Sequence, residues 1–289
     1  MSVLLNGGER ILIQGITGRQ GSFHARRMLE YGSRVVAGVS PGRGGAAVEG
    51  VPVFDTVREA VREKGADTSC LFVPAAGAAD AAHEALENGI RLLVLVTEHV
   101  PVHDAVEVVA RAKELRVRVI GPNTFGIISP GKGKIGIMPH EYYTPGPVGL
   151  VARSGTLSYQ VAAELTAAGL GQSTAVGVGG DPVVGCSLRE VLTHFKDDDE
   201  TRAVVLIGEI GGTAEEEAAE LIAGLGKPVV AYLVGRTAPV GVRMGHAGAI
   251  IERGKGTYAG KAAALREAGA LLAETPWQVA PLVLKSLRG

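Results

Sequence analysis

A short apolar strand, a glycine-rich turn and the start of a helix follow one another in Arg10-Ile11-Leu12-Ile13-Gln14-Gly15-Ile16-Thr17-Gly18-Arg19-Gln20-Gly21. An amphipathic pattern continues to about Tyr31, and Gly32 follows it, as glycine commonly follows the last turn of a helix. A strand that passes through a tight turn into a helix is the first unit of a parallel sheet covered by helices. The chain therefore starts as an α/β protein.

Strands and helices alternate outward from this unit. In the first half, strands are expected at 34–39, 68–73, 92–97 and 117–120, and helices at 75–88, at 102–115 and after the Thr-x-x-Glu capping box of 56–59. In the second half, strands are expected at 148–152, 173–178, 203–207 and 228–234, again with helices between them. Gly, Pro, Lys and Tyr interrupt the pattern up to residue 147. We predict two doubly wound α/β domains, 1–126 and 148–289, joined by a linker at 127–147.

The composition excludes several classes of protein. The 289 residues carry a net charge of −1, which gives no general attraction to nucleic acid or to an anionic membrane. The first residues lack the layout of a signal peptide, and no apolar run reaches the roughly 18 residues that a membrane span needs. Cys70 and Cys186 lie far apart, which indicates reduced thiols rather than a disulfide framework. We expect a cytoplasmic protein that binds neither nucleic acid nor a membrane.

The first half carries a candidate phosphate site. Open α/β sheets bind ligands at the carboxyl ends of their strands, where residues 15–21 offer backbone amides at a helix N-terminus. Their glycines, at positions one, four and seven, depart from the one, three and six of the dinucleotide fingerprint. After the second strand, Ser40-Pro41-Gly42-Arg43-Gly44-Gly45 supplies a cation, Arg43, instead of an acid for a ribose, which favours NADP or coenzyme A. Val96-Thr97-Glu98 ends the fourth strand on the same edge and could face the same ligand; the alternative is a turn that only packs strand on helix.

The second half offers an anion site and a candidate nucleophile. Ser154-Gly155-Thr156 forms another strand-to-helix junction with free amides and hydroxyls. His246 lies in Arg243-Met244-Gly245-His246-Ala247-Gly248-Ala249-Ile250, where small neighbours let backbone and ligands come close. Glu209 directly follows a buried strand, so its carboxylate could bind one imidazole nitrogen of His246 and leave the other free as a nucleophile. The alternatives are a solvated histidine and a solvated carboxylate at a strand end.

Several motifs are absent from the sequence. It contains no G-x-x-x-x-G-K-[ST] loop, no G-x-S-x-G elbow and no Cys/His spacing suited to zinc, so we expect no metal site in this chain. A phosphate-handling histidine without a nucleotide site implies that a partner chain binds the phosphate donor.

Taken together, the motifs resemble those of one family, the α subunits of succinyl-CoA synthetases (succinate–CoA ligases), over nearly all of the chain. The matching segments are Gln14-Gly15-Ile16-Thr17-Gly18, Ser40 to Gly45, Gly121-Pro122-Asn123, Ser154-Gly155-Thr156-Leu157-Ser158-Tyr159, Gly177 to Pro182, Gly208 to Gly212 and Met244 to Ile250. Each segment alone is a weak signal, and their order makes the set highly specific.

The resemblance implies an N-terminal Rossmann-like CoA-binding domain followed by a flavodoxin-like ligase domain. It implies that His246 becomes a phosphohistidine supported by Glu209, that the phosphate rests at Ser154, Gly155 and Thr156, and that Tyr159 lies at the carboxylate substrate. It also implies a β subunit whose ATP-grasp domain binds ATP or GTP with Mg²⁺, and formation of succinyl-CoA through an acyl phosphate. The residues that the resemblance places at CoA are Thr17, Gly18, Arg19, Gln20, Arg43, Val96, Thr97 and Glu98.

One departure from the family pattern bears on the substrate. Asn123-Thr124-Phe125-Gly126 replaces the usual Asn-Cys-Pro-Gly beside the expected active site. This leaves open a sister ligase for malate, citrate or another carboxylic acid. A CoA-binding module without catalysis is a further alternative, although such a module would need neither the His246 loop nor Glu209. An NADP oxidoreductase is disfavoured by the glycine spacing.

Overall fold

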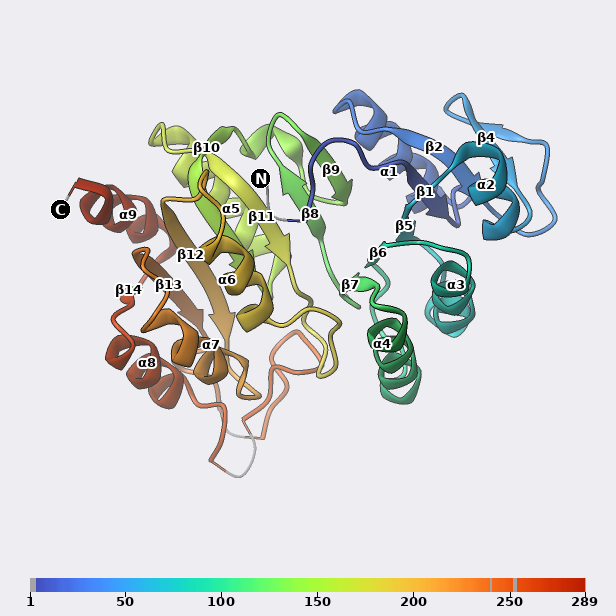
Figure 1. Ribbon diagram of the computed structural model, residues 1–289. Coiled ribbons are helices and arrows are strands. Elements are labelled where there is room, and N and C mark those ends of the chain that lie inside the picture. The colour runs from blue at the N-terminus through green and yellow to red at the C-terminus, as the bar shows by residue number, and fades with distance from the viewer. Residues whose placement is uncertain (1–3, 240, 252–253, 289) are drawn as a thin grey trace.

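The computed structural model describes residues 4–239, 241–251 and 254–288, which form two sheets lying next to each other (Figure 1). The first sheet has the order β3-β4-β2-β1-β5-β6-β7. Apart from the antiparallel β3–β4 pair, its strands are parallel and follow the 3-2-1-4-5-6 order of Rossmann folds. The strands are β1 Ile11–Gln14, β2 Val35–Val39, β3 Ala47–Val48, β4 Val51–Phe54, β5 Thr68–Leu71, β6 Leu92–Leu95 and β7 Arg118–Ile120.

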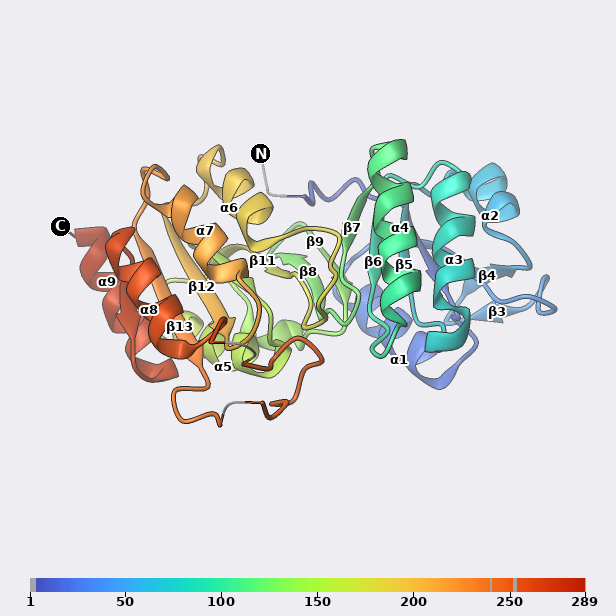
Figure 2. The same cartoon turned by 90° about the horizontal axis from the view of Figure 1, so that it is seen from below.

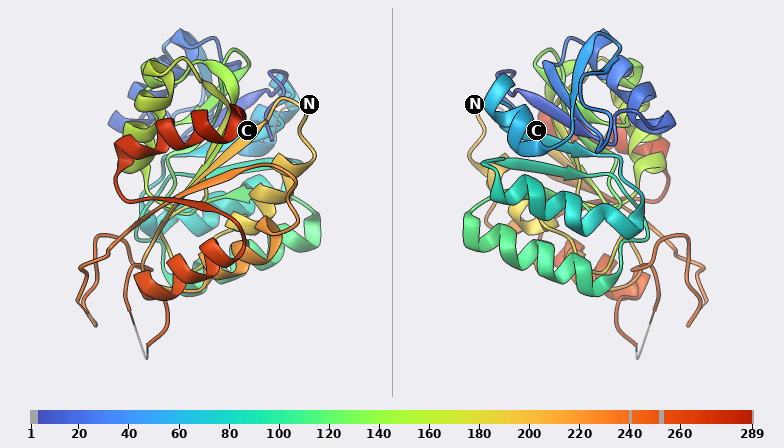
Figure 3. Two further views of the ribbon diagram at one scale, coloured as in Figure 1. Left: turned by 90° about the vertical axis from the view of Figure 1, so that its left-hand side faces the viewer. Right: turned by 90° about the vertical axis from the view of Figure 1, so that its right-hand side faces the viewer.

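Helices cover both faces of the first sheet. The α1 helix (Arg19–Glu30) packs on one face, and α2 (Val57–Lys64), α3 (Ala75–Glu87) and α4 (Val102–Leu115) pack on the other (Figure 3, right). Alternate residues of β1 serve the two faces: Ile11 and Ile13 belong to the core under α1, whereas Leu12 belongs to the core under α2 and α3. Burial on both faces explains why the strands are apolar runs without a polar side.

The second sheet has the order β14-β13-β12-β10-β11-β8-β9. Its five parallel strands follow the 2-1-3-4-5 order of flavodoxin-like folds. They are β10 Pro145–Ala152, β11 Gln172–Gly177, β12 Ala203–Glu209, β13 Val229–Val234 and β14 Leu271–Ala273. The expected pair of α/β domains, Rossmann-like and then flavodoxin-like, is confirmed.

The second sheet is also covered on both sides (Figure 3, left). The helices α5 (Gly155–Ala167) and α9 (Val279–Arg288) pack together on one face, and α6 (Leu188–Lys196), α7 (Ala214–Ile222) and α8 (Tyr258–Glu267) form a row on the other. Short 3₁₀ turns lie at His140–Tyr142 and Pro276–Gln278. No helix among the described residues is long and apolar enough to cross a membrane.

The segment predicted as a linker, 127–147, is not irregular. It contains most of β8 (Gly126–Ser129) and all of β9 (Gly133–Gly136), an antiparallel hairpin that adds to the second sheet through β11. A glycine that we took as a breaker permits this pairing: a Cβ on Gly136 would lie 2.2 Å from the carbonyl oxygen of Phe125. We therefore propose that the boundary between the domains lies at residues 121–125, between β7 and β8.

Candidate functional site

The predicted site residues gather at the carboxyl ends of the parallel strands. In Figure 2, α1 and the described part of the loop between β13 and α8 both lie along the lower side of the molecule, where these strands end. Predicted site residues follow β1, at 17–20, then β6, at 96–98, and β10, at 154–156. Glu209 is the last residue of β12. The structure thus brings the candidate residues of each domain to one edge of its sheet, as expected for ligand sites in open α/β sheets.

The turn after β1 is shaped by the close approach of backbone to backbone. Gly15 has a φ of +80°, and a Cβ on Gly21 would lie 2.1 Å from the carbonyl oxygen of Gly15. This contact brings the start of α1 against the end of β1 and leaves residues 17–20 exposed at the helix N-terminus. Exposed amides at a helix N-terminus suit a phosphate group.

The turn after β2 lies beside this first turn. The Thr17 hydroxyl donates a hydrogen bond to Ser40 Oγ at 2.9 Å. Arg43 is exposed three residues further on, and its backbone N–H donates to the carbonyl oxygen of Ser40 at 3.0 Å. Residues 96–98 follow β6 on the same edge, and the Thr97 hydroxyl donates to the Val73 carbonyl oxygen at 2.7 Å. The eight residues predicted to contact CoA therefore share one exposed edge of the first sheet.

His246 and Glu209 form a direct pair. Glu209 is the last residue of β12, and its Oε2 lies 2.8 Å from His246 Nδ1. The side chain of Glu209 is 6% exposed and that of His246 is 26% exposed. The Glu209 hydrogen bond raises the pKa of His246, against an opposing effect of burial. Gly180 permits the ring to approach, because a Cβ there would lie 2.5 Å from Cγ and Nδ1 of the imidazole.

Charged residues that the sequence did not single out lie behind this pair. Arg153 Nη2 lies 3.3 Å from Glu209 Oε1, and Arg153 Nη1 lies 3.5 Å from Glu215 Oε1. Lys261 forms an ion pair with Glu215. The only signal in the sequence for Arg153 is its place directly before the Ser154 junction. Glu215 is one of three consecutive glutamates at 215–217, so the sequence does not distinguish it from its neighbours.

A hydrogen-bonded path connects the two candidate sites. The N–H of Asn123 donates to the carbonyl oxygen of Thr97 at 2.9 Å, and its side-chain amide donates to Asp181 Oδ1 at 2.9 Å. The N–H of Gly180 donates to the Asn123 carbonyl oxygen at 3.3 Å. Since Gly180 contacts His246, the segment around Asn123 links the predicted CoA edge to the histidine.

The junction after β10 leads into α5 as expected. Ser154 is the N-cap of α5 and makes no side-chain capping bond, so the first amides of the helix are not capped by its own side chain. Tyr159 lies one turn further along, where a Cβ on Gly155 would be 3.3 Å from its hydroxyl oxygen. Burial raises the pKa of Tyr159. Its ring makes an edge contact with the buried Phe125, at 5.7 Å between centroids.

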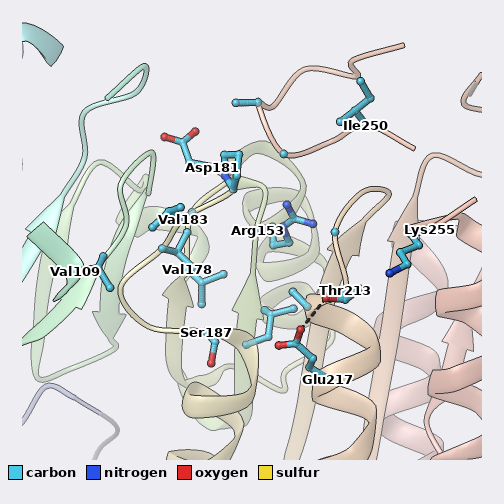
Figure 4. Close-up of a pocket in the computed structure, with 18 of the residues that line it drawn as sticks. Val109, Arg153, Val178, Asp181, Val183, Ser187, Thr213, Glu217, Ile250 and Lys255 are labelled. Carbon is cyan, nitrogen blue, oxygen red and sulfur yellow. Dashed lines mark hydrogen bonds between the residues drawn. The ribbon is translucent and has the colours of Figure 1, made fainter. Parts of the chain in front are cut away.

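A cleft of about 920 Å³ opens beside the histidine loop, which we define as residues 243–250 (Figure 4). Arg153 lies in it between Asp181 on one side and Thr213 with Lys255 on the other (Figure 4). Its wall includes the two residues after His246 but none of the predicted site residues themselves. Within the described residues, no group of three or more His, Cys, Asp or Glu side chains is placed to bind a metal ion.

Both halves of the chain match known protein families. Residues 7–99 match a family described as CoA binding domain, and residues 151–271 match one described as CoA-ligase. The first segment contains β1 to β6, and the second contains β11, β12 and β13.

Relatives with curated names extend over nearly the whole chain. The α subunit 2 of ADP-forming succinate–CoA ligase from Archaeoglobus fulgidus is 56% identical over 99% of this chain and 100% of its own length. The corresponding subunit of Methanothermobacter thermautotrophicus is 55% identical, over 95% of this chain and 93% of its own. That of Aquifex aeolicus is 53% identical, over 100% and 95%.

A solved structure shares the fold of both domains. ATP citrate lyase from Methanothrix soehngenii, in complex with citrate and coenzyme A, superposes with a TM-score of 0.87 at 25% identity. The match covers 98% of this chain but only 51% of that one, so the chain corresponds to about half of the larger enzyme.

Proposed function

The chain belongs to the family of succinate–CoA ligase α subunits, and from this membership we propose that His246 carries the phosphoryl group of the ligase reaction. The chain is therefore a ligase subunit, and its residues 7–99 belong to a CoA-binding domain. The observation that carries the proposal for His246 is its 2.8 Å contact with the buried Glu209.

The contact with Glu209 suits His246 to act as a nucleophile. When Nδ1–H donates to the carboxylate, Nε2 keeps its lone pair and can attack phosphorus. We propose that Nε2 displaces ADP or GDP from the terminal phosphate of the nucleotide. A succinate oxygen then takes the phosphoryl group from Nε2, and the CoA thiolate displaces phosphate from the resulting acyl phosphate. Dividing the reaction in this way replaces one difficult step by easier ones.

The phosphoryl group would be stabilised at the start of α5. The uncapped amides of residues 154–156 and the helix dipole favour an anion by about 0.3–1 kcal/mol, and by up to ~2 kcal/mol where partly buried. Tyr159, with its hydroxyl close to the same helix start, would bind a carboxylate of the acid. We propose succinate as that acid, on the names of the relatives.

CoA would bind along the exposed edge of the first sheet. The N-terminus of α1, at residues 17–20, would receive phosphate oxygens, and residues 96–98 would line the path toward His246. We assign Arg43 to phosphate at the adenosine end, most simply the 3′-phosphate. A partner β subunit with an ATP-grasp domain would hold ATP or GTP and Mg²⁺, in keeping with relatives that are named as α subunits of ADP-forming ligases.

Labelling of the assembled enzyme tests the role of His246. The chain, combined with its β subunit, is incubated with nucleotide labelled on the terminal phosphate. We expect acid-labile, base-stable label on the chain, absent in His246→Asn and present in the control His103→Asn, which changes an exposed histidine on α4. Acid-stable label, or label that persists in His246→Asn, would contradict the proposal.

Calorimetry tests the assignment of Arg43. Loss of a charge-assisted hydrogen bond of roughly 1.5–3 kcal/mol corresponds to about 10- to 100-fold weaker CoA binding by Arg43→Ala. Dephospho-CoA should bind the wild type weakly and respond little to the change. Arg58→Ala, at an exposed position on α2 of the same domain, is the control. Equal CoA affinity of Arg43→Ala and wild type would remove Arg43 from the site.

A further inference from the structure

Four ionised side chains of alternating sign lie buried behind His246. The side chains of Lys261 and Glu215 are fully buried, and those of Arg153 and Glu209 are 7% and 6% exposed. They come from α8, from α7, from the residue after β10 and from the end of β12. Burial of charge is costly unless each ion has a partner, so the arrangement has to be judged by its contacts.

The outer pair consists of Lys261 and Glu215. Lys261 Nζ forms an ion pair with Glu215 and donates to the carbonyl oxygen of Gly211 at 2.9 Å. It also lies 3.5 Å from Oε2 of Glu216, whose side chain is 30% exposed. Glu215 Oε1 accepts the N–H of Glu209 at 3.0 Å. The outer pair therefore binds the backbone at both ends of the turn that follows β12.

Arg153 connects the outer pair to the histidine. Its Nη1 donates to the Gly211 carbonyl oxygen at 3.2 Å and lies 3.5 Å from Glu215 Oε1, while its Nη2 lies 3.3 Å from Glu209 Oε1. Within the described part of the chain, Glu209 Oε1 has no hydrogen bond, so this ion pair is its main polar contact. The other oxygen of Glu209 faces His246 Nδ1.

We propose that Lys261 and Glu215 are positioning residues for the phosphorylated histidine: they place Arg153, which holds Glu209 in the orientation that fixes the proton on Nδ1 of His246. This rests on the proposed role of His246. Without Lys261, the nearest cation left for Glu215 is Arg153. Arg153 would turn toward Glu215 and leave Glu209 Oε1 without a counter-ion. Lys261 and Arg153 both donate to the Gly211 carbonyl oxygen, and Glu215 lies against both of them. Without Glu215, the two cations would repel each other there and Arg153 would move.

The charges predict that the two changes compensate each other. Lys261→Met leaves the buried Glu215 without its nearest counter-ion, and Glu215→Gln leaves the buried Lys261, among the described carboxylates, with only the 3.5 Å contact to the partly exposed Glu216. The double variant removes both buried charges with side chains of similar shape. In the double variant Arg153 keeps Glu209 as its only carboxylate partner. Each single variant should therefore form phosphohistidine more slowly than the double variant. If the two changes acted independently, the double variant would instead be the slowest.

The experiment compares Lys261→Met, Glu215→Gln and the double variant in the full chain with its β subunit. The rate of phosphohistidine formation per folded molecule should fall about 100-fold in each single variant, the size of effect that a misplacement of about 1 Å produces. It should recover by at least about 10-fold in the double. ¹⁵N-histidine NMR of the full chain should show the Nδ1–H tautomer of His246 in the wild type and in the double, and its loss in the singles.

Two further variants keep the outcome decisive. Lys227→Met removes a lysine that donates to the carbonyl oxygens of Phe195 and Asp198, and should lower stability without changing the rate or the tautomer. Arg153→Lys keeps every charge but shortens the connecting side chain. It replaces the single variants in the experiment if those do not fold. It should lose both the rate and the tautomer.

The proposal is overturned if the folded single variants, or Arg153→Lys, keep the wild-type rate and tautomer, or if the double is no better than the singles. Failure of the proposed function is recognised separately. In that case the wild type takes up no label. The tautomer measured by ¹⁵N-histidine NMR still shows whether Lys261 and Glu215 position the imidazole of His246.

Discussion

Replacement of Gly180 by alanine should slow phosphorylation of His246 about 100-fold and leave CoA binding unchanged. A Cβ at this position would lie 2.5 Å from both Cγ and Nδ1 of the imidazole. Carbon atoms in contact are ~3.5 Å apart, so the ring has to move by about 1 Å. The ring is the part that moves, because hydrogen bonds with Asn123 and Gly248 restrain the Gly180 backbone, whereas the side chain of His246 is 26% exposed.

The size of the effect follows from that displacement. A misplacement of about 1 Å in a reacting group costs about 100-fold in rate, or ~2.7 kcal/mol at 1.36 kcal/mol for each factor of ten. The φ of Gly180 lies outside the left-handed region, so alanine brings no backbone strain there. The contact of the new methyl group with the ring is therefore the main perturbation.

The assay is the initial rate of acid-labile label on the chain in the assembled enzyme, with calorimetric titration of CoA beside it. Gly133→Ala is the matched control, since no heavy atom beyond its chain neighbours lies within 4 Å of a Cβ at this strand position. If Gly180→Ala is labelled within about threefold of the rate of Gly133→Ala, the reasoning from ring geometry is refuted.

Four other predictions concern the pH dependence of the rate, the pH dependence of stability, the acid and the core. Because Glu209 raises the pKa of His246 and a protonated imidazole has no lone pair, labelling should fall as pH falls through that raised pKa, and Glu209→Gln should move the midpoint of a pH–rate profile to lower pH, not higher. By the same linkage, the raised pKa of His246 contributes stability below the ordinary histidine pKa of 6.5, and this contribution is lost as pH rises through the raised pKa, which denaturation at several pH values measures. Tyr159→Phe should raise KM for the acid by roughly 10-fold with unchanged labelling; steady-state kinetics with an unchanged KM would exclude the hydroxyl from the acid site. Phe125→Ala should lower the free energy of unfolding by about 3–5 kcal/mol, against about 0.5 kcal/mol or less for the exposed Phe23→Ala, by denaturant titration.

The alternation of strands and helices was enough to predict the fold but not all of its strands. The parallel strands of the second sheet are apolar runs between helices, and four of the five were expected from the sequence. The sequence analysis missed β4, because Val51–Phe54 is short, contains a proline and is separated from β2 by a hairpin instead of a helix. It also missed β8 and β9, whose glycines indicated a loop by local rules, while the pairing of β8 with β11 is decided by the tertiary fold.

The site was predictable where chemistry and strand ends coincide. Glu209 was found because it follows a buried strand, and the structure places it against His246 as expected. Glu215 was not found, because the run 215–217 is acidic throughout and indicates a solvated helix face. In the structure Glu215 is fully buried and Glu217 is exposed. Its partner Lys261 lies 46 residues away, so no local pattern could connect the two.

The pairing of β8 with β11 has a consequence for synthesis on the ribosome. The six parallel strands of the first sheet are complete once β7 has emerged, but Ile127 and Ile128 of β8 pair with Val176 and Ala175 of β11, which are made roughly 50 residues later. At about 5–20 residues per second this interval lasts about 2–10 s. During that time β8 can pair with β9 but not with β11, and two isoleucines that are fully buried in the finished protein lie on a strand with one unpaired edge, open to other nascent chains and to chaperones.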